Sequence, residues 1–272
     1  MRGLIALLLS SVSFQGAAFM AAALLSVSAL GAEAGLHEHR LSPGFGRIVP
    51  EVSYFLDEQG SQSLEDVVTQ SFEKVREYPP QFGYTDAAVW LTFKYRNPGD
   101  IVWLSVNYPM LNDVQIFILD EHQNLLSAYP LGDRLNFIER VLLRPEFTVP
   151  LPASESPISV YLRVQSGSSL EVPMTISEDV VLRQTMESSA WIQGLFFGAM
   201  VMLGLYHILI FLSSGDRSYL YFGGLSLTMA LIQATLWGRS YQFLWPESPG
   251  WNDIAVSVLI NASNFFGVLY IA

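Results

Sequence analysis

An uncharged apolar run from Trp191 to Leu212 divides this chain into two regions suited to different surroundings. A helix of this length, at about 1.5 Å rise per residue, crosses a hydrocarbon core of about 30 Å. Two further apolar runs follow it. We therefore expect residues 187–272 to be the first part of a membrane domain, with helical spans at about 190–212, 219–237 and 254–272.

Composition supports this division, because nearly all charged residues lie between Glu33 and Glu187 and the net charge is −11. Phosphate binding needs clustered Lys and Arg, which are scattered here, so we expect no nucleic-acid partner. The chain has no cysteine, which excludes thiolate metal sites, cysteine nucleophiles and disulfides. An exported region of about 150 residues must then be held together by its apolar core.

The first 34 residues have the form of a targeting segment. Arg2 precedes two apolar stretches that end at Ala32-Glu33-Ala34, a small-x-small cleavage pattern. This predicts a cleaved signal peptide at 1–34; the alternative is an uncleaved anchor helix. Either version exports the next region, so we expect a multi-pass protein of the inner membrane with its N-terminal domain in the periplasm. Arg217 inside against Arg239 outside does not decide the orientation.

Residues 35–186 have the pattern of a β domain. Val89, Leu91, Phe93 and Tyr95 alternate with polar residues and Trp90, and a turn follows at 97–100. Similar short patterns at 101–108, 114–119, 160–164 and 172–176 favour a sandwich of two antiparallel sheets. Ser63-Leu64-Glu65-Asp66 is a capping-box pattern that predicts a short helix.

Five separated motifs carry a resemblance to a known family: GYTDAAVWL at 83–91, YPML at 108–111, YLRVQS at 161–166, DRSYL at 216–220 and YQFLWP at 241–246. In this order they resemble bacterial 7TM receptors with diverse intracellular signalling modules and the second type of extracellular domain. The resemblance implies a jelly-roll-like external domain that is a candidate binder of carbohydrate or another small ligand. It also implies seven helices, of which this sequence covers two and part of a third, usually followed by a cytoplasmic output module.

A ligand site is expected where outward strand faces combine aromatic and hydrogen-bonding side chains, because sugar rings stack on aromatic faces and their hydroxyls need partners. If the three strands concerned lie side by side, their faces merge into one platform. The alternative is that Trp90 and Trp103 pack under loops or against the membrane domain, and that Arg163 pairs with a carboxylate. A second alternative is an anion site at Arg134, Arg140 and Arg144. The predicted ligand-binding residues are Trp90, Lys94, Arg96, Trp103, Asn107, Tyr161, Arg163 and Gln165.

Polar residues and glycines in and beside the spans allow two interpretations each. His207 is either a proton relay or a neutral imidazole bonded to a neighbouring helix. Gly194, Gly198 and Gly204 suit either a homodimer or packing inside one bundle. In the loop after the second span, Tyr241, Trp245 and Trp251 are expected to anchor the membrane interface; the alternative is contact with a ligand. Residues 177–189 are expected to extend the first membrane helix outward, starting at about Glu178, as a rigid lever.

We expect no catalytic residue, cofactor or metal site in this stretch. It has no Gly-x-Ser-x-Gly elbow, phosphate-binding glycine loop or paired histidines with metal-ligand spacing. The preferred function is a transmembrane receptor that couples a small ligand, for example carbohydrate, to an intracellular output. One alternative is the input half of a diguanylate cyclase or histidine kinase whose catalytic module lies beyond residue 272. Another is a membrane-anchored carbohydrate-binding protein. The expected partners are this ligand and the lipid bilayer.

Overall fold

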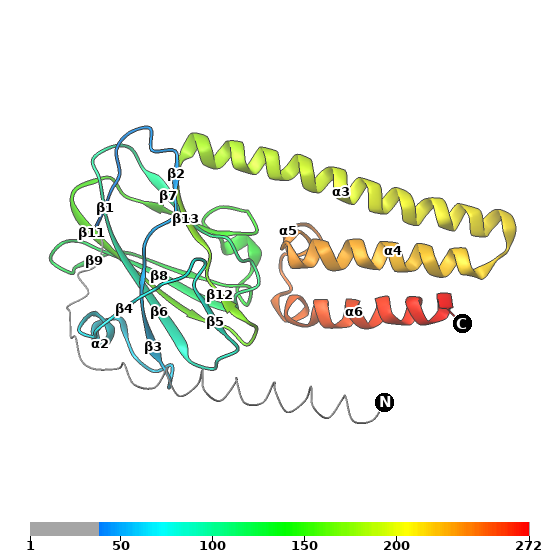
Figure 1. Cartoon of the computed structure of the whole chain (residues 1–272), viewed down its shortest axis with the longest axis horizontal. Helices are drawn as coiled ribbons and strands as arrows, with labels where there is room; N and C mark the ends of the chain where they lie inside the picture. Colours follow the sequence, from blue (N-terminus) through cyan, green and yellow to red (C-terminus); the bar gives the residue numbers. More distant parts are fainter. Residues whose placement is uncertain (1–37, 272) are drawn as a thin grey trace, which may run out of the picture. The chain divides into compact units, whose positions relative to one another are not determined.

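The computed structural model describes residues 38–271, in which a β domain is followed by long helices (Figure 1). The predicted signal peptide at 1–34 lies outside the described residues.

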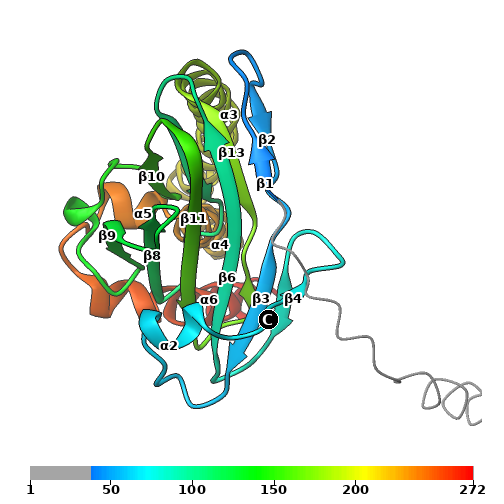
Figure 2. The ribbon, with the colours of Figure 1, turned by 90° about the vertical axis from the view of Figure 1, so that its left-hand side faces the viewer.

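The larger sheet, sheet A, has the strand order β4-β3-β6-β11-β8-β9, with β1 also beside β6. Figure 2 shows its central strands side by side. All neighbours are antiparallel except β1 and β6, which are parallel. The strands are β1 (Glu38–Arg40), β3 (Ser53–Asp57), β4 (Glu73–Lys74), β6 (Ala88–Asn97), β8 (Asp113–Leu119), β9 (Leu125–Leu131) and β11 (Ser154–Gln165).

The smaller sheet, sheet B, has the order β10-β7-β13-β2 and is antiparallel. Its strands are β2 (Arg47–Ile48), β7 (Val102–Val106), β10 (Phe147–Leu151) and β13 (Met174–Glu178). A separate short ladder joins β5 (Gln81–Gly83) to β12 (Leu170–Glu171). The predicted antiparallel sandwich is therefore confirmed.

One apolar core fills the space between the two sheets. The alternating residues of β6 predicted to face inward are fully buried there, together with Ile116 of β8 and Leu104 of β7. The period of two places every second side chain on this face, so the inward residues of β6, β7 and β8 could be predicted from alternation.

A short helix, α2 (Leu64–Val68), lies on the outer side of sheet A. It begins with the predicted capping box, because the Ser63 side chain accepts from the Asp66 N–H and the Asp66 carboxylate accepts from the Ser63 N–H. A 3₁₀ turn, η1 (Phe137–Glu139), lies between β9 and β10.

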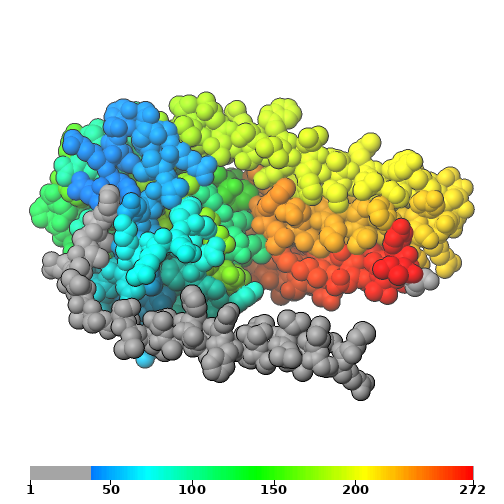
Figure 3. Space-filling model, viewed as in Figure 1, coloured from blue at the N-terminus to red at the C-terminus, as the bar shows by residue number. Residues whose placement is uncertain are grey.

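Three long helices follow: α3 (Asp179–Ser214), α4 (Arg217–Leu236) and α6 (Pro249–Ile271), with the short α5 (Arg239–Phe243) between the last two. Each long helix is long and apolar enough to cross a membrane. Figures 1 and 3 show α4 between α3 and α6. The predicted helix from about Glu178 is confirmed, since β13 ends at Glu178 and α3 begins at the next residue.

The α3–α4 contact explains one of the three membrane glycines. A Cβ at Gly204 would lie 2.6 Å from the Leu227 side chain, so this glycine permits close packing inside the bundle. A Cβ at Gly194 or Gly198 would meet nothing within 4 Å. The His207 ring bonds the Leu203 carbonyl of its own helix at 2.8 Å. Within residues 38–271, its contact with a neighbouring helix is packing on Phe222 of α4 rather than the hydrogen bond of the second alternative.

Candidate functional site

The predicted ligand residues lie on two different sheets. On sheet A, β6 and β11 are neighbours, and Arg163 stands opposite Trp90. Trp103 lies on β7 and Asn107 directly after it, in sheet B. The condition for a single platform, three strands side by side, is therefore not met, because the turn at 97–100 carries the chain from one sheet to the other.

The outer face of sheet A holds an aromatic cluster, which we define as Trp90, Phe117, Tyr161 and the α2 residue Val67. Trp90 is 1% exposed and stacks on Phe117, with ring centroids 5.9 Å apart. Tyr161 is 5% exposed, and Val67 is fully buried against the same cluster. Helix α2 thus covers these aromatic faces, since burying them removes a large apolar area from water. This is the alternative in which Trp90 packs under a connecting segment.

The polar members on sheet A hold neighbouring segments in place. Arg163 Nη2 donates to the Gly60 carbonyl at 2.9 Å, and Nη1 lies 3.4 Å from Asp113 Oδ2. Gln165 Nε2 donates to the Asp86 carbonyl at 3.0 Å. Arg96 Nε pairs with Glu38 Oε1 at 2.9 Å, joining β6 to β1. Lys94 is half-buried on the same strand.

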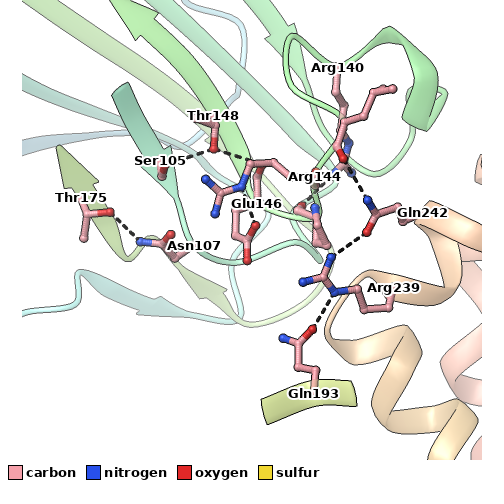
Figure 4. A network of polar contacts seen from close by, with 12 residues as sticks. Ser105, Asn107, Arg140, Arg144, Glu146, Thr148, Thr175, Gln193, Arg239 and Gln242 are labelled. Atoms are coloured by element: carbon pink, nitrogen blue, oxygen red, sulfur yellow. Dashed lines mark hydrogen bonds and ion pairs between the residues drawn. The ribbon is translucent and has the colours of Figure 1, made fainter. Parts of the chain in front are cut away.

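The outer face of sheet B carries small polar residues instead of aromatic clusters. Asn107 Nδ2 donates to Thr175 Oγ1, and the Ser105 and Thr148 hydroxyls share a hydrogen bond, each at 3.1 Å (Figure 4). Trp103 Nε1 donates to Asp179 Oδ1 at 3.2 Å. This bond links sheet B to the first residue of α3, so Trp103 touches the start of the membrane helix.

The proposed arginine anion site is not open in this structure. Arg140 is 8% exposed, and its guanidinium carbon lies 4.5 Å from the Phe137 ring centroid and 4.6 Å from that of Phe147. Its Nη1 donates to the carbonyls of Arg144 and Pro145. Burial lowers the pKa of Arg140 to about 10, which still leaves it charged at neutral pH.

The neighbouring arginines have other roles. Arg144 is buried and pairs through Nε with Glu146 at 2.9 Å (Figure 4). Arg134 is exposed. Each guanidinium has its own environment, so the three do not form a common anion pocket.

A contact region that the sequence did not predict joins the β domain to the segment between α4 and α6; we call it the junction. Tyr241 Oη donates to the Leu135 carbonyl at 2.6 Å, and the Phe137 N–H donates to the Pro246 carbonyl at 2.9 Å. Tyr241 is 2% exposed, and its ring meets Phe137 edge-on at 5.6 Å. The expectation of Tyr241 as an interfacial anchor is therefore wrong, because the β domain covers it.

The backbone approaches closely at the same place. Gly238 has a left-handed φ of +70°, and a Cβ there would lie 2.9 Å from Pro145 and 3.0 Å from Pro109. Only a glycine fits this conformation and spacing without displacement. The family motif at 108–111 included Pro109, but nothing local in either stretch indicates that they meet.

A polar bridge forms a second part of the junction. Asn112 Nδ2 donates to Asp133 Oδ1 at 2.9 Å and to Asp253 Oδ1, at the start of α6, at 3.3 Å. Burial, and secondarily the charge of Asp253, raise the pKa of Asp133 to about 6, against the lowering effects of Asn112, Arg140 and Arg134. The bridge therefore contains a carboxyl group that titrates near neutral pH.

A chain of amides and one arginine extends the junction to α3. Arg239 Nε donates to Gln193 Oε1 of α3 at 2.6 Å, and its Nη1 donates to Gln242 Oε1 at 2.8 Å (Figure 4). Gln242 Nε2 in turn donates to the Leu143 carbonyl of the β domain at 2.9 Å. The junction thus contacts α3, α5 and α6. Among residues 38–271 no group of three His, Cys, Asp or Glu side chains is placed to hold a metal.

Comparison with known proteins matches both regions of the chain to one group of family models. The model described as 7TMR-DISM extracellular 2 matches residues 49–178. The model described as 7TM diverse intracellular signalling matches residues 189–272. No curated protein sequence matches the chain.

Solved structures give weaker similarities. A β-glucuronidase from Ruminococcus gnavus in complex with uronic isofagomine is 9% identical with a TM-score of 0.31, covering 52% of this chain. This chain spans only 30% of that enzyme's length. A family 35 carbohydrate binding module from Clostridium thermocellum is 8% identical with a TM-score of 0.24, covering 48% of this chain and 96% of the module.

Proposed function

Because the chain belongs to the family of 7TM receptors with diverse intracellular signalling modules, we propose that its β domain binds a small ligand and passes the change to the membrane helices through the junction. The family makes the chain part of a transmembrane sensory receptor, and its three apolar helices make it a membrane protein. The ligand, the periplasmic orientation, the inner-membrane location and the coupling are our proposal.

The observation that supports coupling most directly is the burial of Tyr241 and Arg140 against each other. Arg140 comes from the β domain and Tyr241 from the segment between two membrane helices, and the guanidinium lies 5.8 Å from the Tyr241 ring centroid. A ligand shifts a two-state arrangement only by its difference in affinity for the two states. Because this buried contact joins both regions, a change in the β domain on ligand binding also changes the arrangement of the helices.

A second attachment acts on α3. Since β13 runs into α3 without a linker, and Trp103 bonds the first residue of α3, a rotation of sheet B turns this helix as well. Two attachments at different helices favour a receptor over a carbohydrate-binding anchor, because an anchor needs only one span. An output enzyme beyond residue 272, such as a cyclase or kinase, fits the same coupling.

For the ligand, we propose a carbohydrate or another small polar molecule. The half-buried members of the predicted set form two separate candidate surfaces: Lys94, Arg96, Arg163 and Gln165 on sheet A, and Trp103 and Asn107 on sheet B. Trp90 and Tyr161 can contact it only if α2 is displaced, because α2 covers them.

The absence of cysteine allows a direct test of coupling by spin labels. Cysteines at Ser213, near the end of α3, and Val268, near the end of α6, are labelled in the full chain in nanodiscs. Glucose, N-acetylglucosamine and glucuronate are each assayed for binding by calorimetry. A sugar that binds should change the distance between the labels measured by electron spin resonance.

The test variant carries the same label pair with Tyr241→Ala. The matched control carries it with Tyr270→Ala, because Tyr270 is an exposed tyrosine of α6. Tyr241→Ala should keep sugar binding and abolish the distance change, whereas Tyr270→Ala should keep both. Sugar binding with an unchanged distance in the unmodified junction contradicts coupling. Binding of none of the sugars contradicts the carbohydrate assignment.

A further inference from the structure

We propose that a pocket between α3, α4 and α5 binds an amphiphile with one alkyl chain and a carboxylate head group, a fatty acid being the simplest example. This site lies among the helices and goes beyond the proposed ligand sensing by the β domain. Its test does not depend on a β-domain ligand.

The pocket has the size and lining of a small-molecule site. Its volume is about 370 Å³, and small-molecule sites range from roughly 300 to 1,000 Å³. Gly194 and Phe197 of α3 and Phe243 and Leu244 at the end of α5 provide apolar walls. Arg239 and Gln193 are the main polar groups in the lining. An apolar pocket with one cationic group matches an alkyl chain that carries an anionic head.

Arg239 has neutral partners only. Its Nε and Nη1 donate to the side-chain oxygens of Gln193 and Gln242, and none of the ion pairs found within residues 38–271 includes it. The nearby carboxylate of Glu146 is already paired with Arg144 at 2.9 Å. This half-buried cation is held by two amides and has no carboxylate in ion-pair contact, and Glu146 acts on it only from further away.

The partial burial of Arg239 has an electrostatic cost. Loss of hydration lowers the pKa of its guanidinium, and the neighbouring Arg144 acts in the same direction, while Glu146 opposes both. An anion in the pocket would offset this cost. A carboxylate suits the planar fork of a guanidinium, which offers parallel N–H groups.

The position of the pocket along the membrane-capable helices favours an amphiphile over a fully polar anion as its ligand. Arg239 begins α5, three residues after the second membrane-capable helix ends at Leu236, and Gln193 lies within the first. A head group at Arg239 would therefore sit near the membrane boundary, with its chain along the apolar wall of α3. The volume lies at the low end of the range for ligand sites, which favours one alkyl chain over the two of a phospholipid.

Two glycines of α3 allow a matched test of occupancy. Gly194 lines the pocket, whereas Gly198, one turn further along, does not. A Cβ at either position meets nothing within 4 Å. Leucine at Gly194 should therefore fill the pocket without a backbone clash, and leucine at Gly198 should add the same side chain to the same helix outside it.

The experiment uses the full chain in phosphatidylcholine nanodiscs and a dodecanoate analogue with a photoreactive diazirine on its chain. Crosslinking should saturate and modify the pocket walls, and unlabelled dodecanoate should compete. Gly194→Leu should abolish the adduct and Gly198→Leu should retain it. Arg239→Gln should weaken binding at least about tenfold, because a charge-assisted hydrogen bond is lost. Dodecanol should compete at least about tenfold less well than dodecanoate.

Helical circular dichroism of each variant shows whether it has folded. Equal labelling of the Gly194→Leu and Gly198→Leu proteins, both folded, would overturn the site. Competition by dodecanol as strong as that by dodecanoate would overturn the carboxylate assignment. Equally strong competition by phosphatidylglycerol would assign the pocket to a bilayer lipid and overturn the single-chain ligand.

Discussion

The outer faces of the two sheets differ in chemistry and in use. Sheet A carries the aromatic cluster under α2, whereas sheet B carries the hydroxyls of Ser105, Thr148 and Thr175, which are also buried, and bonds to α3 through Trp103. Both faces follow the same two-residue alternation, so the side-chain type decides the outcome. Large aromatic side chains gain more from burial than from exposure, and they stabilise the domain. The polar face and the loops near it connect the domain to the helices.

The strongest test of this difference is Trp90→Ala. Removing a fully buried tryptophan should lower the free energy of unfolding of sheet A by about 3–5 kcal/mol, since a cavity remains under α2. Hydrogen exchange of β6 and β11 amides in the full chain measures this change. Tyr84→Ala is the control, because Tyr84 is 84% exposed. An equal effect of both changes would mean that Trp90 is not part of a core.

The central strands β6, β7, β8 and β11 and the short helix α2 were predictable because their signals are local. Alternation from Val89 to Tyr95 identified a strand and its buried face, and the Ser63–Asp66 spacing identified α2. Alternation does not show what covers the other face, so Trp90 and Trp103 looked equivalent although one is buried under α2 and the other bonds α3.

The junction was not predictable from local pattern. Tyr241 and Leu135 are 106 residues apart in sequence, and a local motif does not relate residues at such a distance. An aromatic residue after a membrane span usually indicates an interfacial position, and this rule placed Tyr241 in the wrong environment. The helix from Glu178 was predictable, since the polar stretch at 177–189 contains Val180, Val181 and Thr185 and runs directly into the span.

At the junction, Arg140→Met should cause the next largest loss of stability. It leaves the carbonyls of Arg144 and Pro145 without their donor and removes a cation from three aromatic rings. We expect a loss of about 2–3 kcal/mol. Hydrogen exchange should accelerate in both η1 and α5. Arg134→Met, at an exposed position, should change neither segment; acceleration in η1 alone would show that Arg140 does not connect the two regions.

The Asp133 bridge should make the junction sensitive to pH. Its folded-state pKa of about 6 lies above the ordinary 3.8, so the folded state binds the proton more tightly than the unfolded state. Stability from this group is therefore complete below pH 3.8 and is lost as the pH rises through 6. Asp133→Asn should stabilise the protein at pH 7.5 by on the order of 2–3 kcal/mol and have little effect near pH 3.5.

Thermal unfolding of the wild type and Asp133→Asn at several pH values isolates this group, because other carboxyl groups contribute equally to both proteins. Asp120→Asn serves as the control, since the hydrogen bonds to Asp120 lower its pKa and should give the opposite sign. A difference between wild type and Asp133→Asn that is independent of pH would show that Asp133 does not titrate in the bridge.

The smallest expected effect tests whether α2 covers the aromatic cluster as a separate unit. Ser63→Ala removes the acceptor for the Asp66 N–H and one partner of the Asp66 carboxylate, which should cost about 1 kcal/mol. If α2 opens locally, exchange accelerates at Asp66 to Val68 while the β7 and β13 amides of sheet B stay unchanged. Thr69→Ala is the control, because its hydroxyl bonds only the Asp66 carbonyl at the other end of α2. Equal acceleration of exchange in α2 and in sheet B would mean that they unfold together. It would contradict the proposed difference between the outer faces of the two sheets.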